Sequence, residues 1–207
     1  MPPRLAGLTG ATLATAPSVC HACVWWQSRE GRRAEKPRWI ERAEDEWGAW
    51  GTIYYDEAGR VLGSMQYGPS PLFPRAAELP AGPPSEDAVL VTCVYLVDQT
   101  SPWVVQSLFL AAIGEAKDKG AGALEAFSYR YPEGQSIQRR FLLHRTVFPH
   151  DFLADFGFRI IRSAGRIELA RLDLGGLQPV EEGARTKVLR AVQEAFQPAP
   201  APAPPGG

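Results

Sequence analysis

Two cysteines near the amino terminus are the first residues in the chain whose spacing suits chemistry. Cys20-x-x-Cys23 has the spacing of one half of a zinc site. A complete site needs two further ligands, and the remaining candidates are Cys93, His21, His144 and His150. None of these forms a second paired motif. Because thiols also pack as small apolar groups, the pattern favours a structural pair over a metal site, and we predict no metal.

A second candidate site lies where an apolar run ends at Tyr129-Arg130-Tyr131. In α/β sheets, ligands gather at the carboxyl ends of parallel strands. These side chains could therefore line an acceptor pocket, and the Tyr129 hydroxyl could supply a proton. The other interpretation is a polar strand end before the turn Pro132-Glu133-Gly134, and the turn residues favour it.

The composition is that of an ordinary soluble globular protein. Of 207 residues, 45% are hydrophobic and 22% are charged, and the formal net charge is -1. This balance predicts neither a nucleic-acid partner nor an acidic membrane surface. No apolar run reaches the ~18 residues of a membrane helix, and no signal-peptide pattern opens the chain. Three cysteines are too few for a secreted disulfide framework. We therefore expect a cytoplasmic protein.

Helical and strand-like segments alternate and predict a mixed α/β (α+β) fold. Expected helices cover 35–47, 102–119, 151–156 and 180–196; expected strands cover 4–8, 51–55, 60–67, 87–97, 123–129, 158–162 and 166–174. Strands 51–55 and 60–67 form a hairpin, and strand 87–97, its helix and strand 123–129 form a right-handed parallel crossover. We expect one domain over 1–196 and a disordered Pro/Ala-rich tail over 197–207.

The early tryptophans are expected to pack over this sheet rather than form a recognition surface, because aromatic side chains bury large areas. They are Trp25, Trp26, Trp39, Trp47 and Trp50.

An apolar strand, a turn, the helix body Ser107–Ile113, a second strand and then Phe152-x-x-x-x-Gly157-Phe158 follow one another in this chain. From Gly51 to Leu174 this order resembles the GNAT superfamily of N-acetyltransferases. The segment Cys20–Trp25 resembles the Cys-x-x-Cys-x-Trp start of an actinobacterial-type branch. The resemblance implies a GNAT-like mixed sheet with flanking helices.

The resemblance implies that acetyl-CoA, or another acyl-CoA, binds at the turn before the long helix. The family uses an R/Q-x-x-G-x-G/A turn whose backbone N–H groups face the pyrophosphate. Here Ser101, Val104 and Gln106 take the key positions, and Ser101-Pro102 makes a conventional helix start. This turn predicts a weakened cofactor site or one closed by its own cap. The implied cofactor-binding residues are Leu96, Val97, Val104, Val105, Gln106, Ser107 and Leu108.

The acid and base of the implied reaction have no motif in this chain. The family often has a tyrosine at the position of Leu153, where it protonates the departing CoA thiolate, and leucine cannot donate a proton. A carboxylate or its water must accept a proton from the amine. The candidates are Asp98 and Glu125 for the base, and Tyr129 for the acid.

Two functions follow from the resemblance. The first is a GNAT-type N-acetyltransferase that transfers an acyl group from acetyl-CoA to an amine by direct attack in a ternary complex. The alternative is a catalytically inactive GNAT-fold binding or regulatory module with a protein partner, which the altered turn and Leu153 favour. The first predicts acyl-CoA and an unidentified amine acceptor as partners.

Overall fold

The computed structural model describes residues 4–97, 102–130 and 146–176. The strands are β1 (Arg4–Gly7), β2 (Gly51–Tyr55), β3 (Val61–Pro69), β4 (Ala88–Leu96), β5 (Ala123–Tyr129), β6 (Phe148–Pro149), β7 (Arg159–Ala164) and β8 (Ile167–Asp173). The helices are α1 (Ser18–His21), α2 (Lys36–Glu46), α3 (Pro102–Asp118) and α5 (His150–Asp155), with short 3-10 turns at 13–15, 33–35, 70–72 and 74–78.

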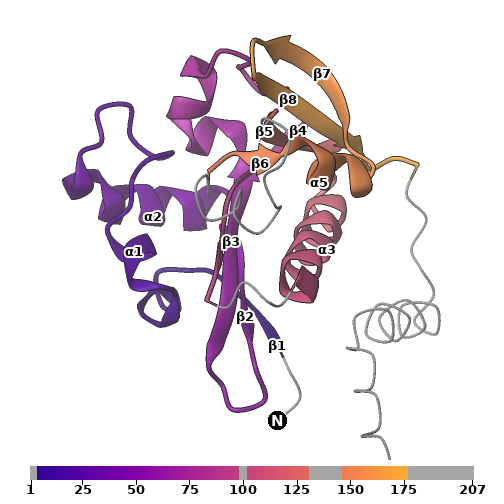
Figure 1. Ribbon diagram of the computed structural model, residues 1–207. Coiled ribbons are helices and arrows are strands. Elements are labelled where there is room, and N and C mark those ends of the chain that lie inside the picture. The colour runs from indigo at the N-terminus through magenta and orange to yellow at the C-terminus, as the bar shows by residue number, and fades with distance from the viewer. Residues whose placement is uncertain (1–3, 98–101, 131–145, 177–207) are drawn as a thin grey trace, which may run out of the picture. The chain divides into compact units, whose positions relative to one another are not determined.

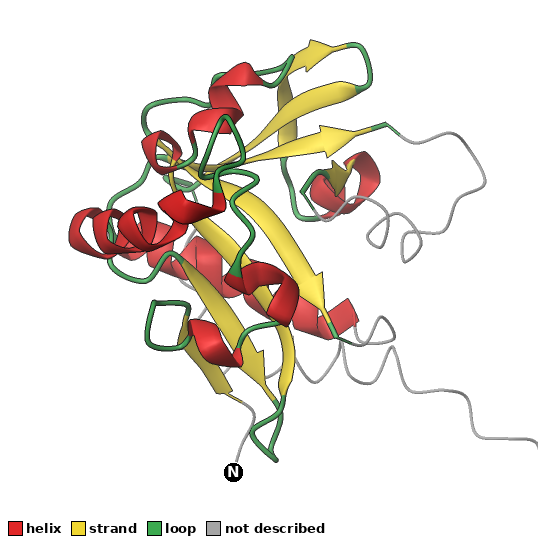
Figure 2. Cartoon of the chain, turned by 90° about the vertical axis from the view of Figure 1, so that its left-hand side faces the viewer, coloured by secondary structure: helices red, strands yellow, loops and turns green. Residues whose placement is uncertain are grey.

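These strands form one mixed sheet with helices on both faces (Figure 1). Their order is β1-β2-β3-β4-β5-β8-β7, and β6 pairs with β5. The β4–β5 and β5–β6 pairs are parallel, and the other neighbours are antiparallel. Helices α1 and α2 lie on one face, which looks toward the viewer in Figure 2, and α3 and α5 lie on the other. The predicted mixed fold with flanking helices is confirmed.

Most predicted elements appear within a residue or two of their expected ends. Strand 123–129 is reproduced as β5, and helix 102–119 is α3, which ends before Gly120. Gly120 has a φ of +77°, the left-handed conformation that glycine adopts without steric cost after a helix. The sequence analysis missed α1 and β6, because four and two residues carry no readable period. The expected helix 180–196 and the tail 197–207 lie outside the described residues.

Each face of the sheet has its own aromatic core. On the α1/α2 face, the buried rings are Trp26, Trp39, Trp50, Phe73 and Phe127. The predicted packing role of the tryptophans is confirmed for these three, whereas Trp25 is 36% exposed. On the α3/α5 face, Phe109 contacts the rings of Phe148, Phe152, Phe156 and Phe158. No helix of the described residues is long and apolar enough to span a membrane.

Candidate functional site

Strand β4 leaves β5 halfway along its length. The two strands pair only from Ala88 with Ala123 to Val91 with Ala126. The next residue, Thr92, is a bulge, because Gln66 of β3 faces Cys93 and Tyr67 faces Val91. A bulge bends its strand and increases the local twist, which carries the rest of β4 away from β5. Residues 92–96, here called the open edge of β4, have no strand partner on the β5 side in the described parts of the chain.

Strand β6 pairs with the end of β5 that β4 does not reach. Ser128 and Tyr129 of β5 pair with Phe148 and Pro149. Strand β8 already covers the other edge of β5 from Ala123 to Tyr129. Because each strand has only two edges, β6 must lie on the β4 side. The first residue of α5, His150, follows directly, so α5 begins where the two strands part.

The amino end of α3 packs on the hairpin of β2 and β3. The side chain of Val104 is fully buried, and its Cγ1 would lie 3.0 Å from a Cβ placed on Gly63. Trp103 packs edge-on against Tyr54 of β2, with ring centroids 5.2 Å apart. Strand β3 separates β2 from β4, so the indole points away from the open edge. Its bulk therefore does not fill the space between β4 and β5.

The helical geometry decides which backbone groups of the predicted cofactor residues are free. The amides of Gln106, Ser107 and Leu108 have acceptors one turn earlier in α3. Pro102 has no N–H, so Trp103 and Val104 supply the first-turn amides without an intrahelical acceptor. Gln106 and Ser107 are half-buried, which leaves their side chains accessible, whereas Val105 and Leu108 are buried. Ser101 lies outside the described residues.

At the end of β4, Leu96 and Val97 pair with β3 residues, which limits the backbone groups that they can offer to a cofactor. The amide of Val97 donates to the carbonyl of Leu62 at 2.9 Å, so it is engaged by the β3 side. Leu96 pairs with Gly63 on the same side. The Val97 side chain is 57% exposed. Backbone groups on the open edge, rather than the Val97 amide, remain for a ligand.

Glu125, a predicted base, is fully buried on β5 and both of its oxygens are engaged. Oε1 accepts from Nη1 of Arg171 at 3.2 Å, and Oε2 accepts from the amide of Ser85 at 2.8 Å. Arg171 also binds Asp87 and Asp173. These bonds raise the pKa of the Arg171 guanidinium above its usual range. The surroundings of Glu125 are those of a structural anion, and they do not support its role as a base.

Of the other two catalytic candidates, only Tyr129 lies in the described residues. Tyr129 ends β5 beside β6, at the point where the strands part. Its hydroxyl accepts a long hydrogen bond of 3.5 Å from Nη1 of Arg166. Asp98 lies outside the described residues. Tyr129 as an acid therefore stays a prediction with a suitable position.

A buried carboxylate that the sequence analysis did not select lies at this end of β5. Glu168 of β8 is 2% exposed and faces Ser128 across the strands. It accepts hydrogen bonds from Nε of Arg130 at 2.6 Å, Nδ1 of His150 at 2.6 Å and Oγ of Ser128 at 3.3 Å. Burial raises the pKa of Glu168, but the hydrogen bonds from Arg130 and His150 outweigh burial and hold this pKa below its usual range.

The motif Phe152…Gly157-Phe158 acts through packing. Phe152 and Phe158 both contact Phe109 of α3, and Gly157 ends α5 with a φ of +85°. Leu153, where the resemblance expects a tyrosine, is 1% exposed and lies in the core. The side chain of Leu153 therefore offers no proton donor and faces none of the solvent.

The three cysteines are free thiols, and all of them lie within electrostatic range of Lys36. Nζ of Lys36 donates to the carbonyl of Cys23 at 3.0 Å, and burial lowers the pKa of this amine. Burial raises the pKa of the Cys93 thiol to about 12, so Cys93 is protonated at neutral pH. The described residues contain no group of His, Cys, Asp or Glu side chains that could hold a metal ion. Cys20 and Cys23 form no such site there.

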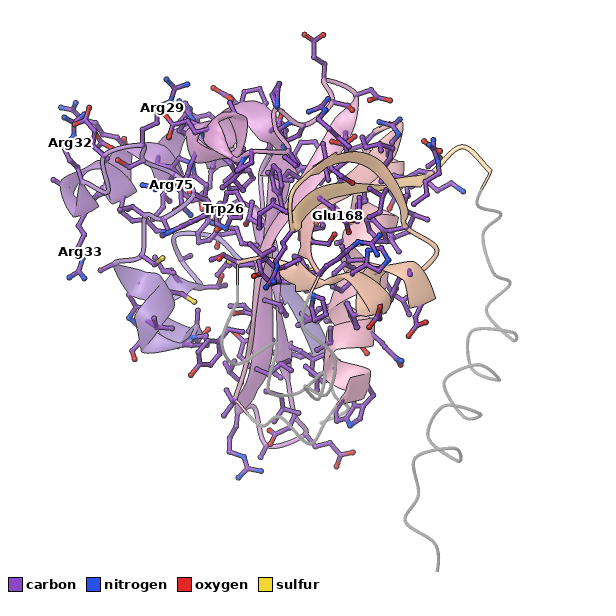
Figure 3. All side chains as sticks on the ribbon, turned by 45° about the horizontal axis from the view of Figure 1, so that its top comes forward. Trp26, Arg29, Arg32, Arg33, Arg75 and Glu168 are labelled. Atoms are coloured by element: carbon purple, nitrogen blue, oxygen red, sulfur yellow. The ribbon has the colours of Figure 1, made fainter. Side chains whose placement is uncertain are left out.

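A pocket of about 440 Å³ opens on the α1/α2 face. Its lining includes Val19, Cys23, Trp25, Arg33 and Arg75. Arg75 stacks on the Trp25 ring at 4.9 Å and donates to the carbonyls of Ser28 and Arg29. Figure 3 shows the arginines of this region on the far side of the sheet from Glu168. Its lining residues in the described ranges include two arginines and no carboxylate, so the electrostatics of the pocket favour an anionic group.

The loop beside this pocket also crosses the sheet where β4 and β5 part. Trp26 stacks on Phe127 of β5, with centroids 5.8 Å apart, and Gln27 donates to Oε1 of Gln66 at 2.9 Å, next to the bulge. Trp26 Nε1 and Gln27 Oε1 are buried and have no hydrogen-bond partner within the part of the chain that the structure describes. Buried polar groups are normally paired, so these two atoms mark a place where a polar ligand would fit.

The comparisons with known proteins show the fold. No protein-family model and no curated protein matches the sequence. The chain is similar to the crystal structure of PaiA N-acetyltransferase from Thermoplasma acidophilum in complex with coenzyme A, at 13% identity and a TM-score of 0.52, covering 84% of this chain and 99% of that one. An N-acetyltransferase from Staphylococcus aureus Mu50 matches at 14% identity and a TM-score of 0.48, covering 84% of this chain and 99% of that one. The fold is that of the GNAT N-acetyltransferases.

Proposed function

We propose that this chain transfers an acyl group from acetyl-CoA, or another acyl-CoA, to an amine. The observation that carries the proposal is the open edge of β4, which begins at the Thr92 bulge and runs toward the amino end of α3. The pantetheine arm of CoA contains two amides. It can bind, as an added strand does, along a strand edge that has no neighbouring strand in the described part of the chain. The similar acetyltransferase structure that contains coenzyme A supports this reading.

The amino end of α3 would bind the pyrophosphate. The amides of Trp103 and Val104 lack intrahelical acceptors, and the positive end of a helix dipole favours an anion. The amino end of this helix follows the carboxyl end of β4, so both binding elements lie together. Leu96, Val97, Val104, Val105, Gln106, Ser107 and Leu108 stay the proposed cofactor segment; among them the Val104 amide and the side chains of Gln106 and Ser107 are best placed.

The reaction is direct attack of the amine nitrogen on the thioester carbonyl. Open-edge amides that bind the carbonyl oxygen would stabilise the negative charge that forms on it. The C–S bond then breaks, and the thiolate leaves with the electron pair. The chain's contribution is to orient the two substrates, which can by itself lower the barrier by several kcal/mol.

The acceptor amine would approach from the α1/α2 face. Trp26 Nε1 and Gln27 Oε1 supply an unpaired donor and acceptor there. The pocket with Trp25, Arg33 and Arg75 would suit an amine with an apolar body and a carboxylate or phosphate. Placement in the actinobacterial-type branch, a protein partner and a cytoplasmic location stay predictions.

Thermal unfolding with acetyl-CoA tests the proposal. At ~100 times its dissociation constant the cofactor should stabilise the protein by about 2.7 kcal/mol, a rise in Tm of roughly 5–10 °C. Gln106→Glu places a negative charge beside the proposed pyrophosphate site and should weaken binding roughly tenfold.

The matched control adds the same charge two turns along α3. A Cβ placed on Gly114 meets no atom within 4 Å, so a side chain can be introduced at this position, and Gly114→Glu is the control variant. It lies ~12 Å from position 106, beyond the ~8 Å screening length, and should bind acetyl-CoA like the wild type. The absence of any shift at millimolar acetyl-CoA would reject the transferase and favour the inactive binding module. If both variants lose affinity for acetyl-CoA equally, the phosphates do not bind at the start of α3.

A further inference from the structure

The network around Glu168 joins a buried anion to a histidine that can exchange a proton. Glu168 is 2% exposed, and His150 is 23% exposed at its side chain. Their contact of 2.6 Å between Oε2 and Nδ1 is short, as expected for a charge-assisted hydrogen bond. Because the carboxylate accepts, Nδ1 of His150 donates. The pair has the geometry in which an anion orients an imidazole and fixes which of its nitrogens carries the inner proton.

The other ring nitrogen of His150 is available. Within the described residues, Nδ1 makes the only hydrogen bond of this imidazole, and Nε2 makes none. Arg130 and Ser128 occupy other positions on the Glu168 carboxylate, at 2.6 Å and 3.3 Å, so the carboxylate is held from three directions. His150 therefore has one nitrogen fixed by a buried anion and one that has no hydrogen-bond partner among the described residues.

The place of His150 connects this pair to the proposed acyl-transfer site. His150 begins α5 directly after β6, and β6 fills the edge of β5 that β4 vacates. Helix α5 packs on α3 through Phe109 and Phe152, so His150 and the amino end of α3 belong to the same face of the sheet (Figure 1). Leu153, one turn further along α5, is buried and has no proton to give. Tyr129 lies next to β6 and is the competing donor.

The face of the sheet on which His150 lies indicates whether this residue acts as an acid or as a base. The cofactor phosphates are proposed at the amino end of α3, so the thiol end of CoA reaches the open edge from the α3/α5 face. The unpaired polar atoms for the amine, on Trp26 and Gln27, belong to the α1/α2 face. A proton donor on α5 therefore meets the leaving sulfur, and a base for the amine would lie on the other side.

We propose that His150, positioned by Glu168, is the general acid that protonates the CoA thiolate; this rests on the proposed acyl transfer. The amine nitrogen forms the new C–N bond, and the C–S bond breaks with its electrons moving to sulfur. Nε2–H of His150 transfers its proton to that sulfur, which yields the CoA thiol. The attacking nitrogen loses its proton to solvent water, and His150 regains a proton from solvent. Arg130 balances the Glu168 anion throughout, and the imidazolium adds to this balance until its proton is transferred.

His150→Asn is the variant that separates catalysis from folding. The asparagine amide can reproduce the Nδ1 donor to Glu168 but has no transferable proton. With acetyl-CoA and a set of primary amines (spermidine, ethanolamine and the α-amino acids), kcat should fall roughly 10²-fold. CoA formation is followed by chromatography, because the protein's own thiols would disturb a thiol reagent. Arg159→Met, which removes only an exposed ion pair with Asp173 outside this network, is the matched control and should stay within about threefold of wild type.

Two readouts exclude a structural role. The wild-type pH profile of kcat should fall on its alkaline side, as it does for an enzyme with an essential general acid, and His150→Asn should lack this limb. Added imidazole should restore part of the activity of His150→Ala but none to His150→Asn, whose side chain fills the site. Glu168→Gln should lower kcat while the acetyl-CoA-induced shift in Tm stays that of wild type.

The outcomes are distinguishable from failure of the proposed function. A wild-type protein that neither binds nor consumes acetyl-CoA overturns the transferase and this inference together. Wild-type turnover with an equally active His150→Asn overturns the inference alone. Activity lost in His150→Asn with an unchanged shape of the pH profile and no imidazole rescue of His150→Ala also overturns it, because the histidine would then act through structure.

Discussion

Two buried carboxylates lie on neighbouring strands of this sheet, and their surroundings differ in kind. Glu125 faces Arg171 across β5 and β8, and Glu168 faces Ser128 across the same two strands. They are 0% and 2% exposed. Glu125 is bound by Arg171 and a backbone amide, neither of which serves as a proton donor to a substrate. Glu168 is bound by an imidazole, that of His150, and imidazole is the group that proteins most often use for proton transfer.

The comparison shows that a buried carboxylate on this sheet can stabilise the fold or orient a histidine, depending on its partner. Where β4, β5 and β8 are fully paired, a carboxylate and an arginine bind each other, and Asp87 and Asp173 share the guanidinium. Beyond the point where β4 separates from β5, the Glu168 carboxylate fixes His150 at the start of α5. Burial alone therefore does not identify a functional acid. The partner of the buried group, and whether that partner has a free atom, decides it.

The largest effect should come from breaking the Glu125 pair. Arg171→Met leaves a fully buried carboxylate without its cation, and we expect the free energy of unfolding to fall by about 3–5 kcal/mol in urea titrations at pH 7. Arg159→Met removes an exposed partner of Asp173 (64% and 48% exposed side chains) and should cost less than ~1 kcal/mol. Acyl transfer per folded molecule should not change in either variant. A stable Arg171→Met protein would contradict a structural role for the pair.

A smaller effect is expected from Glu168→Gln, and it should depend on pH. The pKa of Glu168 is held below its usual range in the folded state, so the unfolded chain binds more protons near the unfolded pKa of ~4.3. The stabilisation is present above that pH and is lost as the pH falls through the folded value. Urea titrations should show a gap of about 1–3 kcal/mol between wild type and Glu168→Gln at pH 7. This difference in the free energy of unfolding should become smaller at acidic pH. A difference that does not change with pH would show that Glu168 is not charged in the folded protein.

The smallest effect should come from Tyr129→Phe, which tests the competing proton donor. The tyrosine hydroxyl has a long contact with Arg166, and its loss should cost at most ~1 kcal/mol of stability. If His150 is the acid, kcat for CoA release should stay within about twofold of wild type. If Tyr129→Phe lowers kcat as much as His150→Asn does, Tyr129 is the general acid and Glu168 is a second structural anion.

Much of the fold was predictable because it rests on local pattern. The apolar run that became β4, the stop at Gly120 and the full extent of β5 follow from hydrophobic periodicity and turn chemistry. The motif around Gly157 correctly predicted the helix that packs on α3. The short strand β6 was not predictable, because two residues carry no period and its partner edge on β5 becomes available only when β4 turns away.

The candidate site was less accessible to prediction. Glu125 was selected for its place on a strand, but its partner Arg171 comes from 46 residues later in the chain. His150 was considered only as a metal ligand, since nothing in the sequence links it to Glu168. The direction of the Trp103 ring, at the start of α3, likewise depends on tertiary packing, because it is set by the contact with Tyr54 of β2.

The sequence by itself determined the mixed sheet, the crossover from β4 through α3 to β5, and a helix start at Pro102 in place of a glycine-rich turn. Each depends on neighbouring residues, whose apolar spacing and backbone preferences act locally. Only the tertiary structure decided that β4 separates from β5 at Thr92, that Glu125 is bound by Arg171, and that Glu168 orients His150 at the start of α5. Those features depend on strand register, and register places residues distant in sequence within hydrogen-bonding distance.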